Sequence, residues 1–302
     1  MQTKTVPLRT ASDYSFSETL NFLITNRIPR AASTRLMGKL SRVRNPVFTR
    51  IALKLWKTFS EDMRLDEATT QKFATLHDCF TRQLKTEARP ISHAIDMVTS
   101  PCDAIVGAHG NIRDLELLQV KGLPYQLDEL VHGTVDLEKY RNGRFVTLRI
   151  KSSMYHHMHA PASCRTQKIH YISGDTWNVN PATLKRIDKL FCRNERAVIE
   201  LELSDHAGHI ALVPVAAILV ASMRFKGLEY PLNLQYRGPN TLPFQHEFSK
   251  GERLGNFEHG STIVMLTSED FSFLPDIKEG QRINMGEALM QAHLPTTQSK
   301  QG

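Results

Sequence analysis

The chain has 302 residues, of which 41% are hydrophobic and 23% charged, a composition that fits an ordinary globular protein and excludes an extended disordered chain. Its longest apolar run, residues 210–223, is shorter than the roughly 20 residues that a membrane-spanning helix needs. The run is rich in β-branched residues and predicts buried strands. The four cysteines form no CxxC pair, so we expect reduced thiols and neither a disulfide framework nor a zinc site.

The first part of the chain is expected to be a loose tail followed by helices. Residues 1–20 are polar, contain Asp13 and Glu18, and lack the apolar segment of a secretory signal. Residues from 21 to about 90 are predicted to be mostly helical, with an end at Arg89-Pro90.

The net charge of +7 is concentrated between residues 27 and 57, a segment without acidic residues. Apolar side chains recur there at spacings of three and four, which predicts two amphipathic helices separated near Pro46. The basic residues are Arg27, Arg30, Arg35, Lys39, Arg42, Arg44, Arg50, Lys54 and Lys57. Three interpretations stay open: an anionic membrane surface, nucleic acid, or a solvated helix packed on the protein's own core. We favour the membrane surface, because aromatic residues are too sparse for base stacking and no nucleic-acid motif occurs.

From residue 91 onward, short apolar runs alternate with Gly, Asn and Asp. Residues 144–150 and 197–203 alternate as half-buried strands do, residues 261–266 form a further apolar strand, and short helices are predicted at 127–131 and 136–140. The fold class is therefore α+β, with a helical N-terminal region (1–90), which we expect to associate with the membrane, and a β-rich core (91–302) built as a sandwich or barrel. Residues 212–220 are interpreted as core, with the lining of a lipid-tail site as the alternative.

The triplet Gly260-Ser261-Thr262, followed by an apolar β-type run, has the local chemistry for self-cleavage. Glycine leaves its carbonyl open to attack and tolerates strained backbone angles, and the next residue carries a hydroxyl. Asp103 and the segment Tyr155-His156-His157-Met158-His159 supply the acid and the bases of an activated nucleophile. Each feature also has a simpler interpretation: a Gly-Ser-Thr turn, a turn residue after Pro101, and strand-end histidines bonded to backbone or to a metal.

Six signatures in a consistent order resemble those of the phosphatidylserine decarboxylase proenzymes, the first of them in two parts, and the resemblance extends from about residue 21 to 292. They are Phe80-Thr81-Arg82, Arg89-Pro90-Ile91, Gln119-Val120-Lys121-Gly122-Leu123-Pro124-Tyr125, Tyr155-His156-His157-Met158-His159, Gly174-Asp175-Thr176-Trp177-Asn178-Val179-Asn180, Phe191-Cys192-Arg193-Asn194-Glu195-Arg196 and Gly260-Ser261-Thr262. The chain departs from the family pattern in three places. His259 stands where leucine or valine usually precedes Gly-Ser, Ala104 where glycine usually follows the aspartate, and Ser163-Cys164 where Asp/Asn-Gly is usual.

The resemblance implies that Asp103, His159 and Ser261 form a self-cleavage triad. His159 takes the proton of Ser261 while Asp103 orients the imidazole, and the hydroxyl attacks the carbonyl of Gly260. Elimination and hydrolysis then convert Ser261 into a covalent pyruvoyl group, which serves as the cofactor. The large subunit ends at Gly260 and the small one starts at the former Ser261. His156 is implied as the proton donor during decarboxylation.

The implied function is conversion of phosphatidylserine to phosphatidylethanolamine and CO2 at an anionic phospholipid surface. We expect a peripheral protein on the cytoplasmic face of the inner membrane, with large and small subunits from one precursor and a possible homodimer. No nucleic-acid partner and no metal are expected. Two alternatives remain: a lipid-binding relative in which His259 and Ala104 have stopped processing, and a histidine-liganded metallohydrolase.

Overall fold

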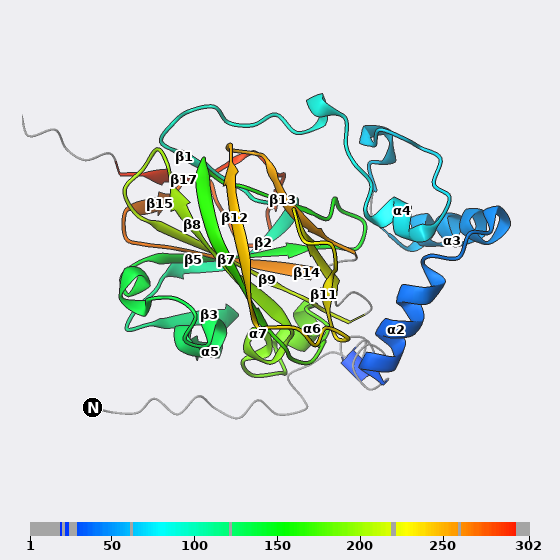
Figure 1. Ribbon diagram of the computed structural model, residues 1–302, viewed down its shortest axis with the longest axis horizontal. Helices are drawn as coiled ribbons and strands as arrows, with labels where there is room; N and C mark the ends of the chain where they lie inside the picture. The colour runs from blue at the N-terminus through cyan, green and yellow to red at the C-terminus, as the bar shows by residue number, and fades with distance from the viewer. Residues whose placement is uncertain are drawn as a thin grey trace, which may run out of the picture.

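The computed structural model describes residues 19, 22–23, 29–60, 63–120, 123–218, 222–258 and 261–293. Its centre is an eight-stranded antiparallel sheet with the order β12-β7-β8-β9-β14-β5-β2-β16 (Figure 1). In that order the strands are β12 (Thr241–Phe248), β7 (Cys164–Ile172), β8 (Arg196–Leu203), β9 (His209–Val215), β14 (Ser261–Thr267), β5 (Arg144–Ile150), β2 (Ala104–Asn111) and β16 (Arg282–Ile283). The predicted strands at 144–150, 197–203 and 261–266 are confirmed. The expectation that 144–150 is half-buried is wrong, because Val146 and Leu148 join one apolar cluster while Phe145 joins the other.

Three smaller sheets accompany the large one, and all four are open, so the sandwich and not the barrel describes the core. The four-stranded sheet contains β11 (Leu232–Asn233), β10 (Ser222–Phe225), β13 (Arg253–Phe257) and β6 (His157–His159). The three-stranded sheet contains β1 (Met97–Thr99), β17 (Ala288–Ala292) and β15 (Phe271–Phe273), and β3 (Glu116–Val120) pairs with β4 (Leu123–Gln126).

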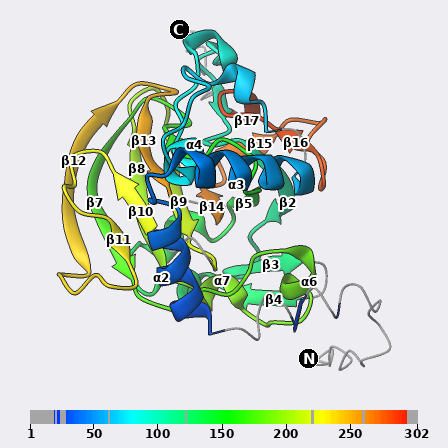
Figure 2. The same ribbon diagram turned by 90° about the vertical axis from the view of Figure 1, so that its right-hand side faces the viewer.

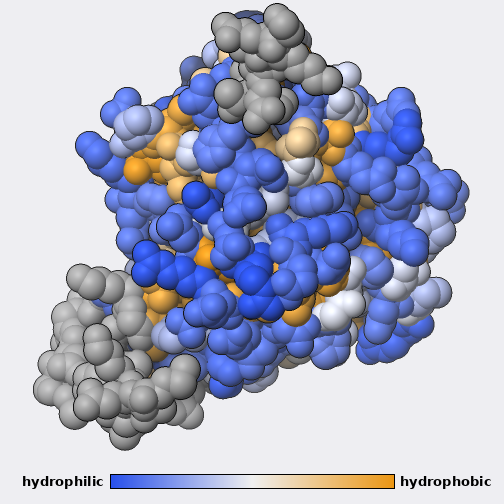
Figure 3. All heavy atoms as spheres, turned by 90° about the vertical axis from the view of Figure 1, so that its left-hand side faces the viewer, coloured by the Kyte–Doolittle hydropathy of each residue, from blue (hydrophilic) through white to orange (hydrophobic). Residues whose placement is uncertain are grey.

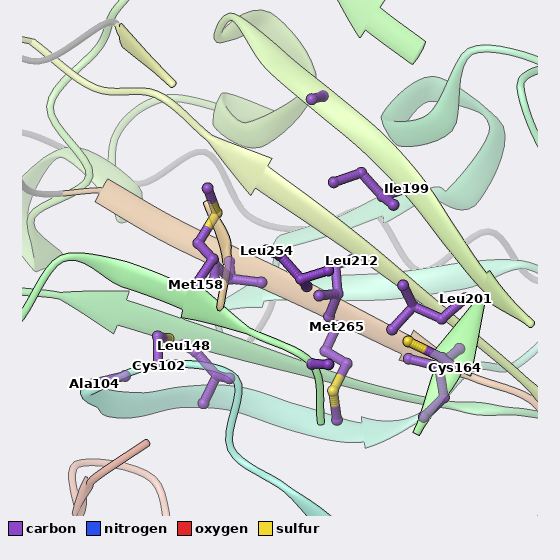
Figure 4. Packing of buried hydrophobic residues seen from close by; sticks show 14 of the residues in the cluster. Cys102, Ala104, Leu148, Met158, Cys164, Ile199, Leu201, Leu212, Leu254 and Met265 are labelled. Atoms are coloured by element: carbon purple, nitrogen blue, oxygen red, sulfur yellow. The ribbon is translucent and has the colours of Figure 1, made fainter. Parts of the chain in front are cut away.

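The central strand β14 is covered on both faces, and every one of its residues is buried. Ile263 and Met265 lie in one apolar cluster together with Met158 and Leu254 of the four-stranded sheet (Figure 4). Val264 and Leu266 point to the other face and join a second cluster beneath the helices that follow β4. Successive side chains of a strand point to opposite faces, so β14 contributes residues to both apolar clusters. Burial on both faces explains its unbroken apolar sequence.

Two helices precede the sheets, as the periodicity predicts: α2 (Arg30–Leu40) and α3 (Pro46–Phe59). The break near residue 46 is confirmed and has a local cause. The side chain of Asn45 accepts hydrogen bonds from the backbone N–H groups of Val47 and Phe48, and Pro46 occupies the first helical position. In Figure 2, α2, α3 and the following α4 (Leu76–Phe80) lie on the side of the molecule where β14 begins.

The prediction that residues up to about 90 are mostly helical is wrong beyond Phe59. In the described part of that stretch, only α4 and two 3₁₀ turns, η2 (Leu65–Glu67) and η3 (Thr86–Ala88), are helical. The reason is tertiary pairing: Ala68 and Leu84 form an antiparallel bridge, which satisfies backbone groups that a helix would otherwise use.

The other helices are short. The segment predicted at 127–131 is α5 (Leu127–Val131), and the one predicted at 136–140 is a 3₁₀ helix, η4 (Leu137–Tyr140). Two four-residue helices follow, α6 (Pro181–Leu184) and α7 (Leu190–Arg193). None of the helices in the described ranges has the length and apolarity to span a membrane.

Candidate active site

Ser261 is the first residue of β14, where it pairs with Ile150 of β5. Its side chain is fully buried, and its hydroxyl has no hydrogen-bond partner among the described residues. A buried hydroxyl without a partner is costly, so such groups often have a chemical role. Gly260 and His259, the other side of the expected cleavage site, lie outside the described residues.

A cavity of about 750 Å³ opens next to the start of β14. One wall is apolar and comes from α3 and α4, with Leu55, Trp56, Phe59 and Phe80. The rest of the lining is mixed: Arg149, Lys151, Ser153, Asn178 and Asn180 are polar, whereas Val179, Ala217 and Ile218 are apolar. Ile150, the strand partner of Ser261, also lines the cavity. The size falls within the range of about 300–1,000 Å³ that is typical of small-molecule sites.

Asp103 is fully buried immediately before β2, and its main partner is Arg89. The guanidinium Nε and Nη2 of Arg89 donate to the two carboxylate oxygens at 2.8 and 2.6 Å. The backbone N–H of Met285 donates a third hydrogen bond, at 2.9 Å. Arg89 is also paired with Glu67 at 2.8 Å. This bidentate geometry holds Asp103 in one orientation.

His159 has both ring nitrogens engaged. Nδ1 lies 2.8 Å from the carbonyl oxygen of Gly251, so it carries the proton, and Nε2 accepts from the hydroxyl of Tyr155 at 3.1 Å. Burial lowers the pKa of His159 to about 4, although the hydrogen bond to Gly251 and the charge of Asp103 act in the opposite direction. The imidazole is therefore neutral at pH 7, with its basic nitrogen bonded to Tyr155.

No hydrogen bond joins Asp103, His159 and Ser261 in the described structure, although the backbone N–H of His159 does donate to Pro101, two residues before Asp103. Strand register explains the separation. Arg149 pairs with Ile105 on one side and Thr262 on the other, so two strand spacings, roughly 10 Å, separate the starts of β2 and β14.

The side chain of His159 also points to a different face from that of Ser261. Ser261 shares the alternation of Ile263 and Met265, which lie in the same apolar cluster as Met158. His157 stacks on Tyr155 and lies parallel to His159, so these two histidines occupy the face of β6 opposite to Met158. The expected triad stays a prediction about the reacting state.

His156 is fully buried just before β6, and its carbonyl oxygen accepts from the backbone N–H of Phe257, three residues before Gly260. Its ring packs edge-on against Phe80, with ring centroids 5.8 Å apart. Phe80 in turn packs on Trp56 of α3 at 4.1 Å, and both aromatic residues line the cavity. His156 is thus one side chain removed from the cavity.

The expected membrane-binding residues divide into two groups. Arg30 pairs with Asp175 at 2.6 Å and its guanidinium stacks on Trp177 at 3.7 Å, and Arg42 pairs with Glu258 at 2.7 Å. These two attach the helices to the rest of the protein. Arg35, Lys39, Arg44, Arg50 and Lys54 are exposed, and Arg27 lies outside the described residues.

Helix α3 buries one face and exposes another apolar one. Thr49 is buried and donates to the carbonyl of Ala74, on the inward face. The exposed apolar residues recur at a spacing of four, namely Val47, Ile51, Leu55 and Phe59, with exposures of 58–83%, and the last two of them also line the cavity. In contrast, Figure 3 shows that the face of the molecule away from these helices is mainly hydrophilic. The interpretation as a helix packed on its own core accounts for only part of this surface.

Several residues around the site were not assigned a role from the sequence alone. Arg89 lies within a recognised motif, but nothing in the sequence shows that it pairs with Asp103. Tyr155 directly precedes His156, and Glu258 lies two residues before Gly260; only this proximity could have drawn attention to them. All four cysteines are free thiols, and within the described ranges no three His, Cys, Asp or Glu side chains converge as metal ligands would.

A family model described as phosphatidylserine decarboxylase matches residues 76–291, a range that includes Asp103, His159 and Ser261. A phosphatidylserine decarboxylase proenzyme of Brevibacillus brevis is 32% identical over 270 residues, covering 87% of this chain and 95% of the relative. Proenzymes of the same name from Vibrio parahaemolyticus and Chromobacterium violaceum are 32% identical over 274 and 285 residues. These two alignments cover 86% and 90% of this chain, and 94% and 99% of the relatives.

The matches extend over the large sheet, the cavity and the segment that opens β14, so they concern the whole architecture and not one motif. The chain belongs to the phosphatidylserine decarboxylase family.

Proposed function

We propose that this protein is a self-processing, pyruvoyl-dependent decarboxylase that converts phosphatidylserine to phosphatidylethanolamine and CO2. The observation that carries the proposal is the position of Ser261. Ser261 is the first residue of the central strand, directly after the expected scissile bond, and its buried hydroxyl has no hydrogen-bond partner among the described residues. Its strand partner Ile150 lines a cavity that has both apolar and polar residues.

Self-cleavage requires a base for the hydroxyl of Ser261, and His159 is our candidate. Its imidazole is neutral at pH 7 and has a lone pair on Nε2, the nitrogen that now accepts from Tyr155. To act as the base, this nitrogen must exchange the Tyr155 hydroxyl for that of Ser261. Because the side chain of His159 lies on the face of β6 away from Ser261, the exchange requires the imidazole to turn toward β14 in the reacting state. Asp103 would then stabilise the imidazolium by its charge.

The environment of Ser261 fits a serine that becomes a pyruvoyl group. The side chain is shielded from water and has no competing hydrogen bond among the described residues. Its backbone is held by pairing with Ile150 of β5, and the next residue, Thr262, pairs with both β5 and β9. A pyruvoyl group at this position would supply an electron sink for decarboxylation. His156 is our candidate for donating the proton to the product, because it is buried next to the aromatic wall of the cavity.

The cavity is suited to an amphiphilic substrate. Leu55, Trp56 and Phe59 would contact acyl chains, while Lys151 and Asn178 would bind the charged headgroup. Ala217 and Ile218 also line the cavity, which supports the alternative that part of the run 212–220 lies along a lipid-tail site.

The exposed apolar residues of α3, next to Arg50 and Lys54, support attachment to an anionic phospholipid surface. The proposal includes a peripheral location on the cytoplasmic face of the inner membrane, a division into a membrane-associating region (1–90) and a catalytic core (91–302), and a homodimer as a possible assembly.

The test is intact mass analysis and denaturing electrophoresis of the purified protein, followed by assay with labelled phosphatidylserine. We expect two chains, with a blocked small chain that begins at position 261, and release of labelled CO2. Ser261→Ala should abolish cleavage and activity together. His159→Ala should block cleavage, whereas His156→Ala should permit cleavage and weaken decarboxylation. A single full-length chain that binds anionic vesicles would instead support the non-processing, lipid-binding alternative.

A further inference from the structure

Glu258 lies in the connection between β13 and β14, two residues before Gly260. Its backbone N–H donates to the carbonyl of Ser222, and its side chain is only 5% exposed. A carboxylate at such a position is expensive to bury unless charged partners surround it. Its partners therefore indicate what this acidic residue does.

Two arginines bind the carboxylate of Glu258, one to each oxygen. Arg42 Nη2 donates to Oε2 at 2.7 Å, and Arg224 Nε donates to Oε1 at 2.9 Å. His77 of α4 is 3.9 Å from Oε1. Burial alone would raise the pKa of Glu258, but the hydrogen bonds from Arg224 and Arg42 outweigh it and lower the pKa to about 2.

The two arginines come from different parts of the protein. Arg224 belongs to β10, which pairs with β13. It is therefore part of the sheet whose strand β13 directly precedes the segment with the expected cleavage site. Arg42 belongs to the turn after α2, and the carbonyl of the adjacent Ser41 accepts from the backbone N–H of His77. Glu258 therefore joins the N-terminal helices to the segment that contains the cleavage site.

We propose that Glu258 is a positioning residue for self-cleavage, and that Arg42 and Arg224 fix the chain two residues before the expected Gly260–Ser261 cleavage site. The inference rests on the proposed function, since it concerns the same reaction. Cleavage of this kind depends on placement: a displacement of about 1 Å can cost roughly 100-fold in rate. A residue fixed by two ion pairs, two positions from the reacting carbonyl, can control such a displacement.

The contacts also predict that the fold survives loss of the carboxylate. The side chains of Arg42 and Arg224 are 46% and 43% exposed, so water can solvate both guanidinium groups when Glu258 is neutral. Removing the carboxylate charge should therefore alter placement of the scissile segment more than stability.

The experiment measures the rate at which freshly produced full-length chain separates into two chains. Glu258→Gln is expected to cleave about 10- to 100-fold more slowly than the wild type. Arg42→Met should be slower than Arg42→Lys, because lysine keeps a charge that can reach the carboxylate. In the Glu258→Gln background, Arg42→Met should have no further effect, as expected of two residues that act through one contact.

Glu247→Gln is the matched control, because it removes the acidic member of an exposed ion pair, Arg165–Glu247 at 2.6 Å, in a different region. It should cleave at the wild-type rate. Thermal unfolding of each variant in a Ser261→Ala background reports folding on a single uncleaved species. A Glu258→Gln rate within about twofold of the wild type, or an undiminished effect of Arg42→Met in the Glu258→Gln background, overturns the inference while the decarboxylase proposal stands. A wild-type chain that never cleaves overturns the proposed function itself.

Discussion

Replacing Arg89 by methionine should strongly destabilise the protein, because it removes the main partner of a buried carboxylate. The side chain of Asp103 is 1% exposed and that of Arg89 is 5% exposed. Loss of the guanidinium removes two hydrogen bonds, of 2.8 and 2.6 Å, and leaves only the backbone N–H of Met285. Breaking a buried ion pair by removal of one partner typically costs about 3–5 kcal/mol. We expect a loss in that range.

Urea unfolding of Arg89→Met in a Ser261→Ala background would measure this loss on one uncleaved chain, with the slope of the transition checked for constancy. Arg165→Met provides a control in which the partner carboxylate is exposed, and it should cost at most about 1 kcal/mol. Adding Asp103→Asn should recover part of the stability, since the charge without a partner is gone. A cost for Arg89→Met equal to that of the control, or no recovery in the double variant, would refute the reasoning.

Three further predictions concern the buried histidines of β6, the hydroxyl of Tyr155 and the exposed apolar residues of α3. Burial lowers the pKa values of His157 and His159 to about 3 and about 4, so between those values and about 6.5 the unfolded chain binds more protons than the folded one. The free energy of unfolding of the Ser261→Ala chain should fall as the pH drops from 7 to 5, by up to about 1.4 kcal/mol per pH unit for each histidine. Adding His159→Gln should flatten the curve, and a flat curve for the Ser261→Ala chain itself would contradict the prediction. Tyr155→Phe leaves Nε2 of His159 without its donor and should cost about 1–3 kcal/mol in urea unfolding, whereas Tyr230→Phe, with a 44% exposed side chain, should cost almost nothing. Ile51→Asp should weaken pelleting with anionic vesicles, while Ile95→Asp, equally exposed at 62% against 63%, should not; equal effects of the two variants would argue against α3 as the membrane contact.

Local pattern was sufficient for several elements of the fold. Asn45-Pro46 carries both a capping side chain and a residue suited to the first helical turn, so the break between α2 and α3 is visible in the sequence. Apolar residues at every second position, Val146, Leu148 and Ile150, likewise predicted β5, because this period is typical of a strand. The prediction of helix for residues 60–90 was wrong for the opposite reason. The conformation there depends on the bridge between Ala68 and Leu84, sixteen residues apart, which a local pattern does not predict.

The candidate site divides in the same way. The order of the motifs that contain Asp103, His156, His159 and Ser261 indicated the family of the chain, and the comparisons confirmed that family. Their mutual distances depend on strand register across β2, β5 and β14, which the motifs do not encode. The hydrogen bonds of His159 to Tyr155 and Gly251 could not be predicted from the motifs either. Gly251 is distant in the chain and is brought next to His159 by the pairing of β13 with β6.

By itself, the sequence determined the family to which this protein belongs: the types, order and neighbours of its candidate site residues are covalent facts that folding does not alter. Tertiary structure alone decided how those groups are paired: Arg89 with Asp103, Tyr155 with His159, and Arg42 with Glu258. Each of these partners is chosen by packing and burial. A charged or polar group removed from water must find a partner among the side chains and backbone groups that the fold brings near it.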